Sequence, residues 1–382
     1  MAIAEPVRTD ERVQTDWVAV LRGLAPRFAE RAAAHDTADT FVADNYAELR
    51  ARRVFSAGVP AELGGGGATH AELCDAMREL AHGCGATALA LSMHTHQVVI
   101  AAWRWRHEGA PVAAFLRRVA TEELILVTSG GSDWLAGSGR AEPVAGGFRV
   151  HARKVFASGS PAGDLFMTMA ILDDPTAGPT VLHLAIPFAA PGVTIHDNWL
   201  TLGMRGTGSH DVTLDGVFVP DAAVGIRRPS GRWSPVFHVI ASIALPLIYS
   251  AYVGVAEAAR DLAVREATRR RDDPVTQEAV GSMETDLAAA RLALRSMIDA
   301  AKGERMGPEV TNRVLIGRGL AGQAVLRTVE AALEVAGGAG FFRGLGLERL
   351  FRDAQGARYH PLRATAQRRY TGRLALGLDV ND

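Results

Sequence analysis

The sequence predicts an α+β protein with three parts: an N-terminal α-helical domain over residues 1–122, a middle antiparallel β domain over 123–232, and a C-terminal four-helix bundle over 233–382. The main observation is a change of period. Apolar residues recur at helical spacing up to about residue 122, alternate as in strands from about 123, and return to helical spacing near 234. Composition agrees, because alanine and leucine dominate the outer parts, whereas valine, isoleucine, phenylalanine and threonine are frequent in the middle.

The N-terminal domain is predicted to contain long helices in "VAVLRGLAPRFAERAAAH" and "HAELCDAMRELAHGCGATALALSMHTHQVVIAAWRW". Pro60 and the glycines at 64–67 break the helical pattern between these stretches, and Thr69 is a suitable N-cap for the second helix. The glycines lack the spacing of a phosphate-binding loop, so we expect a plain turn here.

The middle domain is predicted from short runs of strand-forming residues that are separated by glycine, proline and aspartate. Examples are "LILVTS", "GFRVHARKVFAS", "DLFMTMAIL" and "HDVTLDGVFVP". Gly146 and Gly147 fit a tight hairpin turn. We therefore expect a small antiparallel sheet.

The C-terminal part opens with Trp233–Ala256, which contains no Asp, Glu, Lys or Arg. By length and composition this segment resembles a membrane span. It contains prolines and serines, however, and runs directly into Glu257 and Arg260 without a positively charged flank. We therefore expect a helix that is buried on all sides of a bundle, and no membrane span. Two later alanine-rich stretches are consistent with a bundle of four long helices.

The overall composition excludes several partners and compartments. The 41 Lys and Arg residues and the 42 Asp and Glu residues nearly cancel, giving a net charge of −1, so nucleic acid is not an expected partner. The two cysteines, Cys74 and Cys84, have neither disulfide-framework nor metal-site spacing. The N-terminal residues show no apolar signal core. We expect a cytoplasmic protein without a bound metal.

Four local motifs occur in a characteristic order along the chain. They are "VTSGGSD" (127–133), "KVFASG" (154–159), "LGMRGTGS" (202–209) and "EVAGGAGFFRGLGLERLFRDA" (334–354). Together with the helix, sheet and helix order, they make the chain similar to the acyl-CoA dehydrogenase superfamily over nearly its whole length. The resemblance implies the fold of that superfamily and a flavin between the β domain and the C-terminal bundle.

The resemblance also implies which residues hold the flavin ring. The backbone around Val127 and the hydroxyls of Thr128 and Ser132 are expected to bind the pyrimidine edge, Phe156 to cover the ring, and Ser158 to bond to it. From the residues alone, Thr128 and Ser132 equally fit turn residues that end a strand, and Phe156 fits a core residue.

The glycine pair Gly337 and Gly338 is expected to approach the ADP part of an FAD bound by a neighbouring subunit, because glycine has no Cβ to keep a pyrophosphate away. The same pair also fits a helix C-cap. His96 and Arg205 are predicted to contact the substrate, although Arg205 equally fits a residue that stabilises its own loop. We expect FAD as the cofactor and a homodimer or homotetramer as the assembly.

The sequence departs from the dehydrogenases at the catalytic base. These enzymes use a glutamate to remove the α-proton of an acyl thioester. One position for that glutamate corresponds to Pro361, and the other lies close to Ala244, so neither carboxylate is present. Next to the first position stands His360, eight residues after Arg352. Reduced-flavin monooxygenases of the dibenzothiophene monooxygenase kind carry a histidine at that offset, and one on a long N-terminal helix, for which His94 and His96 are the candidates.

Three functional hypotheses follow. The first is an FAD-dependent acyl-CoA dehydrogenase that desaturates an acyl thioester with an unusual base and passes electrons to an electron-transfer partner. The second is a two-component monooxygenase that receives reduced FMN or FAD from a flavin reductase and uses His360 as its catalytic residue, acting on another small molecule. The third is a non-catalytic relative that only binds flavin or thioester.

Overall fold

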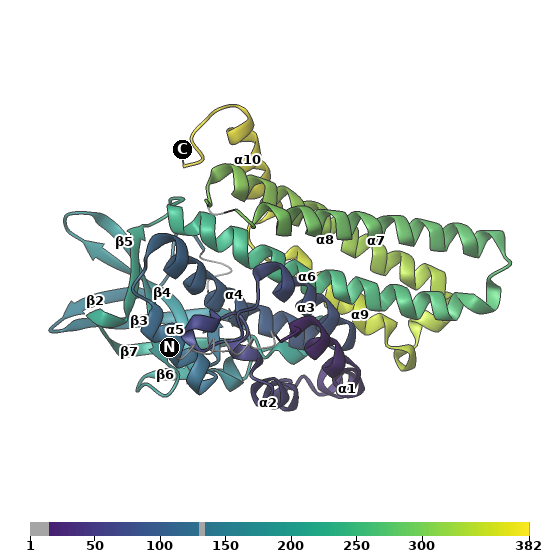
Figure 1. The fold of residues 1–382 in the computed structure, drawn as a ribbon, viewed down its shortest axis with the longest axis horizontal. Coiled ribbons are helices and arrows are strands. Elements are labelled where there is room, and N and C mark those ends of the chain that lie inside the picture. The colour runs from purple at the N-terminus through teal and green to yellow at the C-terminus, as the bar shows by residue number, and fades with distance from the viewer. Residues whose placement is uncertain (1–14, 130–133, 304, 382) are drawn as a thin grey trace, which may run out of the picture.

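The computed structural model describes residues 15–129, 134–303 and 305–381. Helices come first, a sheet follows, and long helices complete the chain (Figure 1). The predicted α+β class and the order of its parts are confirmed. In Figure 1 the sheet lies at one end of the molecule, and the three longest helices extend away from it.

The N-terminal part consists of α1 (Trp17–Ala38), α2 (Ala43–Ala51), α3 (His70–Gly83), α4 (Gly85–Glu108) and α5 (Ala113–Glu122). Thr69 is the N-cap of α3, as predicted: its hydroxyl accepts a hydrogen bond from the N–H of Glu72 at 3.2 Å, and the Glu72 carboxylate accepts one from the N–H of Thr69 at 3.4 Å. The glycine-rich turn before it is a packing feature, because a Cβ on Gly66 would lie 2.4 Å from the ring of Trp17.

The middle part is one sheet of β1 (Leu126–Thr128), β2 (Arg140–Val144), β3 (Gly147–Ala157), β4 (Leu165–Asp174), β5 (Gly178–Pro187), β6 (Val193–Ile195), β7 (His210–Pro220) and β8 (Val224–Pro229). The strand order is β6-β7-β3-β2-β4-β5-β8, and β1 pairs with β4. Most pairs are antiparallel, as predicted, whereas β1 and β2 each pair with β4 in the parallel direction. The β2–β3 hairpin turns at Gly146, which has a φ of 78°.

The C-terminal part consists of α6 (Pro235–Ala267), α7 (Pro274–Ala300), α8 (Pro308–Ala336), α9 (Leu347–Ala354) and α10 (Ala364–Ala375). The sequence predicts four long helices here, and the described residues form three. The fourth predicted helix is replaced by short ones, because glycines at 337, 338, 340, 344 and 346 interrupt the chain after α8. The short α9 packs against α6 and α8, and α10 packs against α8.

The uncharged segment forms most of α6, which contacts α3, α4, α7, α8 and α9 (Figure 1). Its most apolar window is 94% buried inside the protein, so burial accounts for its lack of charge. The helix passes very close to α3, since a Cβ on Gly254 would lie 2.3 Å from the carbonyl oxygen of Arg78. Thus α6 is the central helix of the molecule.

Candidate active site

Phe156 is held in an unusual position at the end of β3. Its φ is 60°, a left-handed conformation that bulky residues rarely adopt, and the pairing of β3 with β7 shifts register between Lys154 and Ala157. The residue is 51% exposed, and its ring meets the ring of Trp199 edge-on, with the centroids 5.8 Å apart. The exposure shows that Phe156 is not a core residue, and the strain is typical of positions that the surrounding structure holds in place.

A buried chain of hydroxyl groups begins two residues later. Ser158 Oγ lies 2.8 Å from Ser209 Oγ, which lies 2.6 Å from Thr207 Oγ1, and Thr207 donates to the carbonyl oxygen of Met204 at 2.9 Å. Because Thr207 uses its hydrogen on that carbonyl, Ser209 must donate to Thr207, and Ser158 must donate to Ser209. The hydroxyl of Ser158 is therefore left as an acceptor for any ligand beside it.

The other predicted ring contacts lie at the end of β1. Val127 is fully buried, so only its backbone is available to a ligand. Thr128 is half-buried, and its hydroxyl donates to the carbonyl oxygen of Ser129 at 3.2 Å. Ser132 lies outside the described residues. Thr128 is thus the last residue of β1, and its hydroxyl oxygen still has accepting capacity.

Gly337 ends α8 with a φ of 61°. A Cβ at this position would approach only the guanidinium of Arg270, at 3.9 Å, and one on Gly338 would meet nothing within 4 Å. The geometry therefore supports the interpretation of Gly337 as the C-cap of α8. The open space beside both glycines is also compatible with close approach of a ligand.

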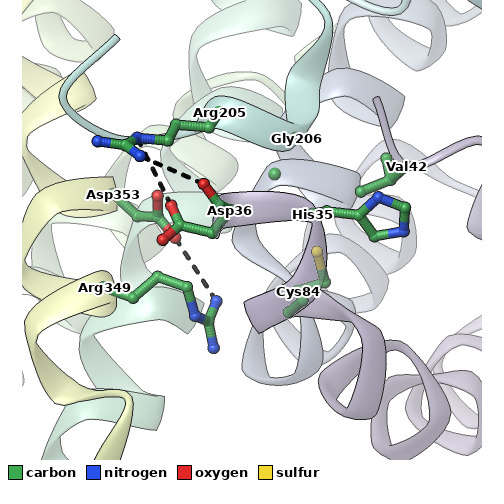
Figure 2. Close-up of a pocket in the computed structure, with 10 residues that line it drawn as sticks. His35, Asp36, Val42, Cys84, Arg205, Gly206, Arg349 and Asp353 are labelled. Atoms are coloured by element: carbon green, nitrogen blue, oxygen red, sulfur yellow. Dashed lines mark hydrogen bonds and ion pairs between the residues drawn. The ribbon is translucent and has the colours of Figure 1, made fainter. Parts of the chain in front are cut away.

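Arg205 points into a small cavity between α1, the loop before β7 and α9. Figure 2 shows its guanidinium beside Asp36, and the cavity has a volume of about 10 Å³, which fits a single water molecule. Nε of Arg205 donates to the carbonyl oxygen of Thr201 at 2.9 Å and lies 3.5 Å from the carboxylate of Asp39. Through these contacts Arg205 binds the loop before β7 to the N-terminal helices.

His360 follows α9, and its ring packs against a tyrosine of α6. Nε2 of His360 lies 2.7 Å from the hydroxyl oxygen of Tyr252. The guanidinium of Arg318 in α8 donates to the carbonyl oxygen of His360 at 2.6 Å. Burial of the ring, with the nearby charge of Arg318, lowers the pKa of His360 to about 3. The ring is therefore neutral at physiological pH.

His96 on α4 is one of the groups whose charge acts on His360, and its own ring is held within its helix. Nδ1 of His96 donates to the carbonyl oxygen of Ser92 at 3.0 Å, and Nε2 accepts from the side-chain amide of Gln97 at 2.9 Å. Burial lowers the pKa of His96 to about 4. Both histidines of the site are therefore neutral.

His94, the other histidine candidate of α4, has a structural position. Its Nε2 donates to the carbonyl oxygen of Phe55 at 2.7 Å, and its Nδ1 accepts from the N–H of Leu126 at 3.0 Å. Both ring nitrogens are thus used to join the N-terminal helices to β1.

Among the described residues, no carboxylate forms a hydrogen bond with the His360 side chain. Within the part of the chain that the structure describes, no carboxylate is among the groups that shift the pKa of His360. Glu257, the buried carboxylate of α6, forms ion pairs with Arg78 at 2.8 Å and with Arg291 at 2.6 Å. It is therefore committed to holding α6 against α3 and α7.

Sequence reasoning missed three residues of this region. Trp199 packs on Phe156, Tyr252 bonds to His360, and Arg318 holds the His360 backbone. For Tyr252 a signal was present, because a polar hydroxyl within an uncharged, fully buried helix needs a specific partner.

Comparison with known proteins identifies the family. The N-terminal domain of acyl-CoA dehydrogenases matches residues 16–122, and their C-terminal domain matches residues 247–363. The chain belongs to the acyl-CoA dehydrogenase family.

Within this family, the chain is similar to proteins that carry out other reactions. The amino sugar nitrososynthase RubN8 of Streptomyces rubradiris is 30% identical over 377 residues, which cover 93% of this chain and 88% of the relative. A dibenzothiophene monooxygenase of Rhodococcus erythropolis is 28% identical, and the match covers 91% of this chain and 90% of the relative. The solved structure of KijD3 with FMN and dTDP-3-amino-2,3,6-trideoxy-4-keto-3-methyl-D-glucose is 28% identical, covers 96% of both chains, and has a TM-score of 0.87.

These relatives contradict the first functional hypothesis, so desaturation of an acyl thioester is the wrong reaction for this family member. The site supplies the physical reason. Removal of an α-proton needs a base, and Pro361 and Ala244 occupy the positions of the dehydrogenase glutamates.

Proposed function

We propose that this protein is a two-component, flavin-dependent monooxygenase that oxygenates a nitrogen or sulfur atom of a small molecule, with an amino sugar as the leading substrate candidate. The observation that carries the proposal is the site around His360, where Nε2 lies 2.7 Å from the hydroxyl oxygen of Tyr252 and where Pro361 and Ala244 stand at the positions of the dehydrogenase glutamates. The nitrososynthase and monooxygenase relatives support it.

The charge of the site suits oxygenation of an amine. An amine attacks an electrophilic oxygen only through the lone pair of its neutral form. Arg318 supplies a positive charge close to His360, because its guanidinium donates to the carbonyl oxygen of that residue. A positive neighbour lowers the pKa of a bound amine, so the reactive free base is favoured. A sulfur substrate needs no such deprotonation and fits the same site.

The cofactor we propose is reduced flavin, supplied by a separate flavin reductase, and KijD3 favours FMN over the FAD predicted from the sequence. When bound, reduced flavin activates dioxygen, so that one oxygen atom enters the substrate and the other leaves as water. Phe156 and Trp199 would cover the ring, and Ser158 would accept a hydrogen bond from it. The chain's own contribution is to hold the ring and to exclude water from the buried side.

A homodimer or dimer of dimers remains part of the proposal. Phe341 and Phe342 follow the glycine pair at the end of α8 and are 89% and 71% exposed. Exposed phenylalanines side by side are typical of a contact surface. Light scattering at micromolar concentration is expected to give a multiple of the 40.6 kDa chain mass, and a monomer would contradict the assembly.

The proposed function is tested by oxygen labelling. The purified protein is supplied with FMN, NADH, a flavin reductase and ¹⁸O₂, together with amino sugars or with the matching sugars that carry hydroxyl in place of the amine. We expect labelled oxygen in the products of the amines or of a parallel set of thioethers, and none in those of the hydroxyl analogues. His360→Gln is expected to lower labelling by about 10²-fold without loss of flavin binding. Unlabelled products from every substrate would overturn the proposal.

A further inference from the structure

The contact between Tyr252 and His360 determines which nitrogen of the imidazole carries hydrogen. The hydroxyl of Tyr252 lies 2.7 Å from Nε2, and turning the ring over would place a carbon atom at this distance, which is too short for a carbon–oxygen contact. The ring orientation is thus assigned by the contact itself. Tyr252 is fully buried in α6, so its hydroxyl hydrogen has no access to water.

The hydrogen in this contact belongs to the tyrosine. Among the described residues, Nε2 of His360 is the one hydrogen-bond partner recorded for the Tyr252 hydroxyl. Burial raises the pKa of Tyr252 far above its usual value, so the phenol keeps its hydrogen. If Nε2 donated instead, the phenol hydrogen would be buried without an acceptor, at a cost of about 1–3 kcal/mol. Tyr252 therefore donates, and a neutral His360 carries its own hydrogen on Nδ1.

Two further contacts fix the segment that carries the ring. The hydroxyl of Tyr249, one turn before Tyr252, donates to the carbonyl oxygen of Ala357 at 2.8 Å. Arg318 donates to the carbonyl oxygen of His360, and its guanidinium lies over the ring of Tyr249, 5.6 Å from the centroid. The backbone on which His360 stands is thus bound to both α6 and α8. Nδ1 has no protein partner among the described residues, and it is the nitrogen left for a ligand.

A buried guanidinium places a positive charge close to the pair. Arg318 on α8 is only 5% exposed, and its Nε has no hydrogen-bond partner among the described residues. His96 on α4 is neutral. Asp353 on α9 acts on Tyr252 but accepts a hydrogen bond from Met204 N–H. A donor with a buried positive charge behind it stabilises negative charge that develops in front of it.

We propose that Tyr252 is a positioning residue that fixes His360 as the Nδ1–H tautomer, so that His360 acts as a hydrogen-bond donor to negative charge and not as a general base. This role rests on the proposed oxygenase function in one respect: that function determines which species accepts the hydrogen bond from His360. The tautomer is a property of the protein alone, and it can be measured without flavin or substrate.

The test is ¹⁵N nuclear magnetic resonance of histidine-labelled protein without flavin, with the His360 signals assigned from their loss in His360→Gln. We expect the wild-type ring to remain neutral from pH 8 to pH 5.5, with hydrogen on Nδ1 and a bare Nε2. In Tyr252→Phe we expect a mixture of tautomers and a raised pKa, because the donor that stabilises the neutral ring is removed. Tyr249→Phe is the matched control, which removes a buried hydroxyl from the same segment and is expected to preserve the tautomer.

The results separate this inference from the proposed function. Hydrogen on Nε2 in the wild type, or an unchanged tautomer in Tyr252→Phe, overturns the positioning role even if the protein oxygenates amines. The expected tautomers together with unlabelled products overturn the oxygenase function and leave the positioning role intact. If Tyr252→Phe does not fold, the wild-type spectrum alone decides the tautomer. In the active protein, Tyr252→Phe is expected to lower kcat by about 10-fold with little change in KM for the substrate.

Discussion

Asp353 in α9 accepts a hydrogen bond from the main-chain N–H of Met204 at 2.5 Å, which joins the loop before β7 to the C-terminal helices. The carboxyl is buried, and burial raises its pKa to about 6. The neighbouring Arg352 reinforces the junction, because it donates to the carbonyl oxygen of Leu202 at 3.0 Å and forms an ion pair with Asp36 at 2.6 Å. The loop that carries Trp199 and Ser209 is thereby held against the helix that leads to His360.

The raised pKa of Asp353 predicts a specific pH dependence. The folded protein binds the carboxyl proton more tightly than the unfolded chain does, so the contribution of this group to stability is complete below about pH 4 and is lost as the pH rises through about 6. Asp353→Asn keeps an acceptor for Met204 and does not ionise. The free energy of unfolding of the variant, minus that of the wild type, is expected to increase by about 2 kcal/mol between pH 4.5 and pH 7.5. Urea denaturation at the two pH values checks this, and a constant difference would contradict it.

Part of this structure could be predicted from the sequence, because periodicity reports which face of an element is buried. The change of period located the sheet, and the pair Thr69 and Glu72 located the start of α3. Periodicity fails for α6, which is buried on every side and therefore shows no face. Tyr252 could not be assigned to the site for that reason. Phe156 could be placed by resemblance, but its left-handed backbone depends on a register shift between strands that are distant in sequence.

The reaction was predicted wrongly for a related reason. The "LGMRGTGS" element is one of the four motifs that carry the resemblance to acyl-CoA dehydrogenases, and in the structure it maintains the fold. Arg205 clamps the loop to the N-terminal helices, and Thr207 and Ser209 form hydrogen bonds within and beside it. A motif that stabilises the fold is compatible with any reaction that the fold supports. The reactions are distinguished at positions 244 and 361, where this chain has Ala244 and Pro361 and the dehydrogenases have their glutamate.

The buried histidines predict loss of stability in acid. Burial lowers the pKa of His70, His94 and His96 to about 4, and that of His183 and His360 to about 3. The unfolded chain binds protons at these groups below about pH 6.5, whereas the folded protein does not. Their contribution is therefore complete above about pH 6.5 and is lost as the pH falls toward 4.

Each of these histidines changes the free energy of unfolding by up to about 1.4 kcal/mol per pH unit. Asp353 changes the free energy of unfolding in the opposite direction over the same range. We expect the denaturation midpoint in urea to fall steeply between pH 6.5 and pH 5. In His94→Gln the denaturation midpoint is expected to change less steeply with pH, because one of the five histidines is removed. This variant is expected to be less stable at every pH, because His94 joins Phe55 to Leu126. A midpoint that is independent of pH over this range would show that the histidines are protonated in the folded state.

The contact between α3 and α6 predicts opposite effects for two glycine substitutions. Gly254→Ala would place a Cβ 2.3 Å from the Arg78 carbonyl oxygen and force two buried helices apart, which we expect to destabilise the protein by about 2 kcal/mol or more. Gly281→Ala in α7 meets nothing within 4 Å, and the higher helix propensity of alanine is expected to stabilise the protein by about 0.5–1 kcal/mol. Thermal or chemical denaturation checks both. Equal changes in the free energy of unfolding for the two variants would mean that α3 and α6 can move apart without loss of stability.

The exposed ring of Phe156 predicts a loss of flavin binding without a loss of stability. Phe156→Gly removes the ring and relieves the left-handed backbone at φ 60°, so we expect a folded protein that is as stable as the wild type or up to about 1 kcal/mol more stable. Its affinity for reduced FMN is expected to fall by about 10-fold, because a stacked aromatic contact contributes about 1 kcal/mol or more.

Phe218 on β7 provides the matched control, since it is also 51% exposed. Phe218→Ala removes a similar exposed ring from the sheet and is expected to leave flavin affinity unchanged. Anaerobic titration with reduced FMN, followed by the tryptophan fluorescence of the protein, measures the affinity of each variant. If both variants bind as the wild type does, the ring of Phe156 lies away from the flavin, and the strain at this position serves the packing of Trp199 alone.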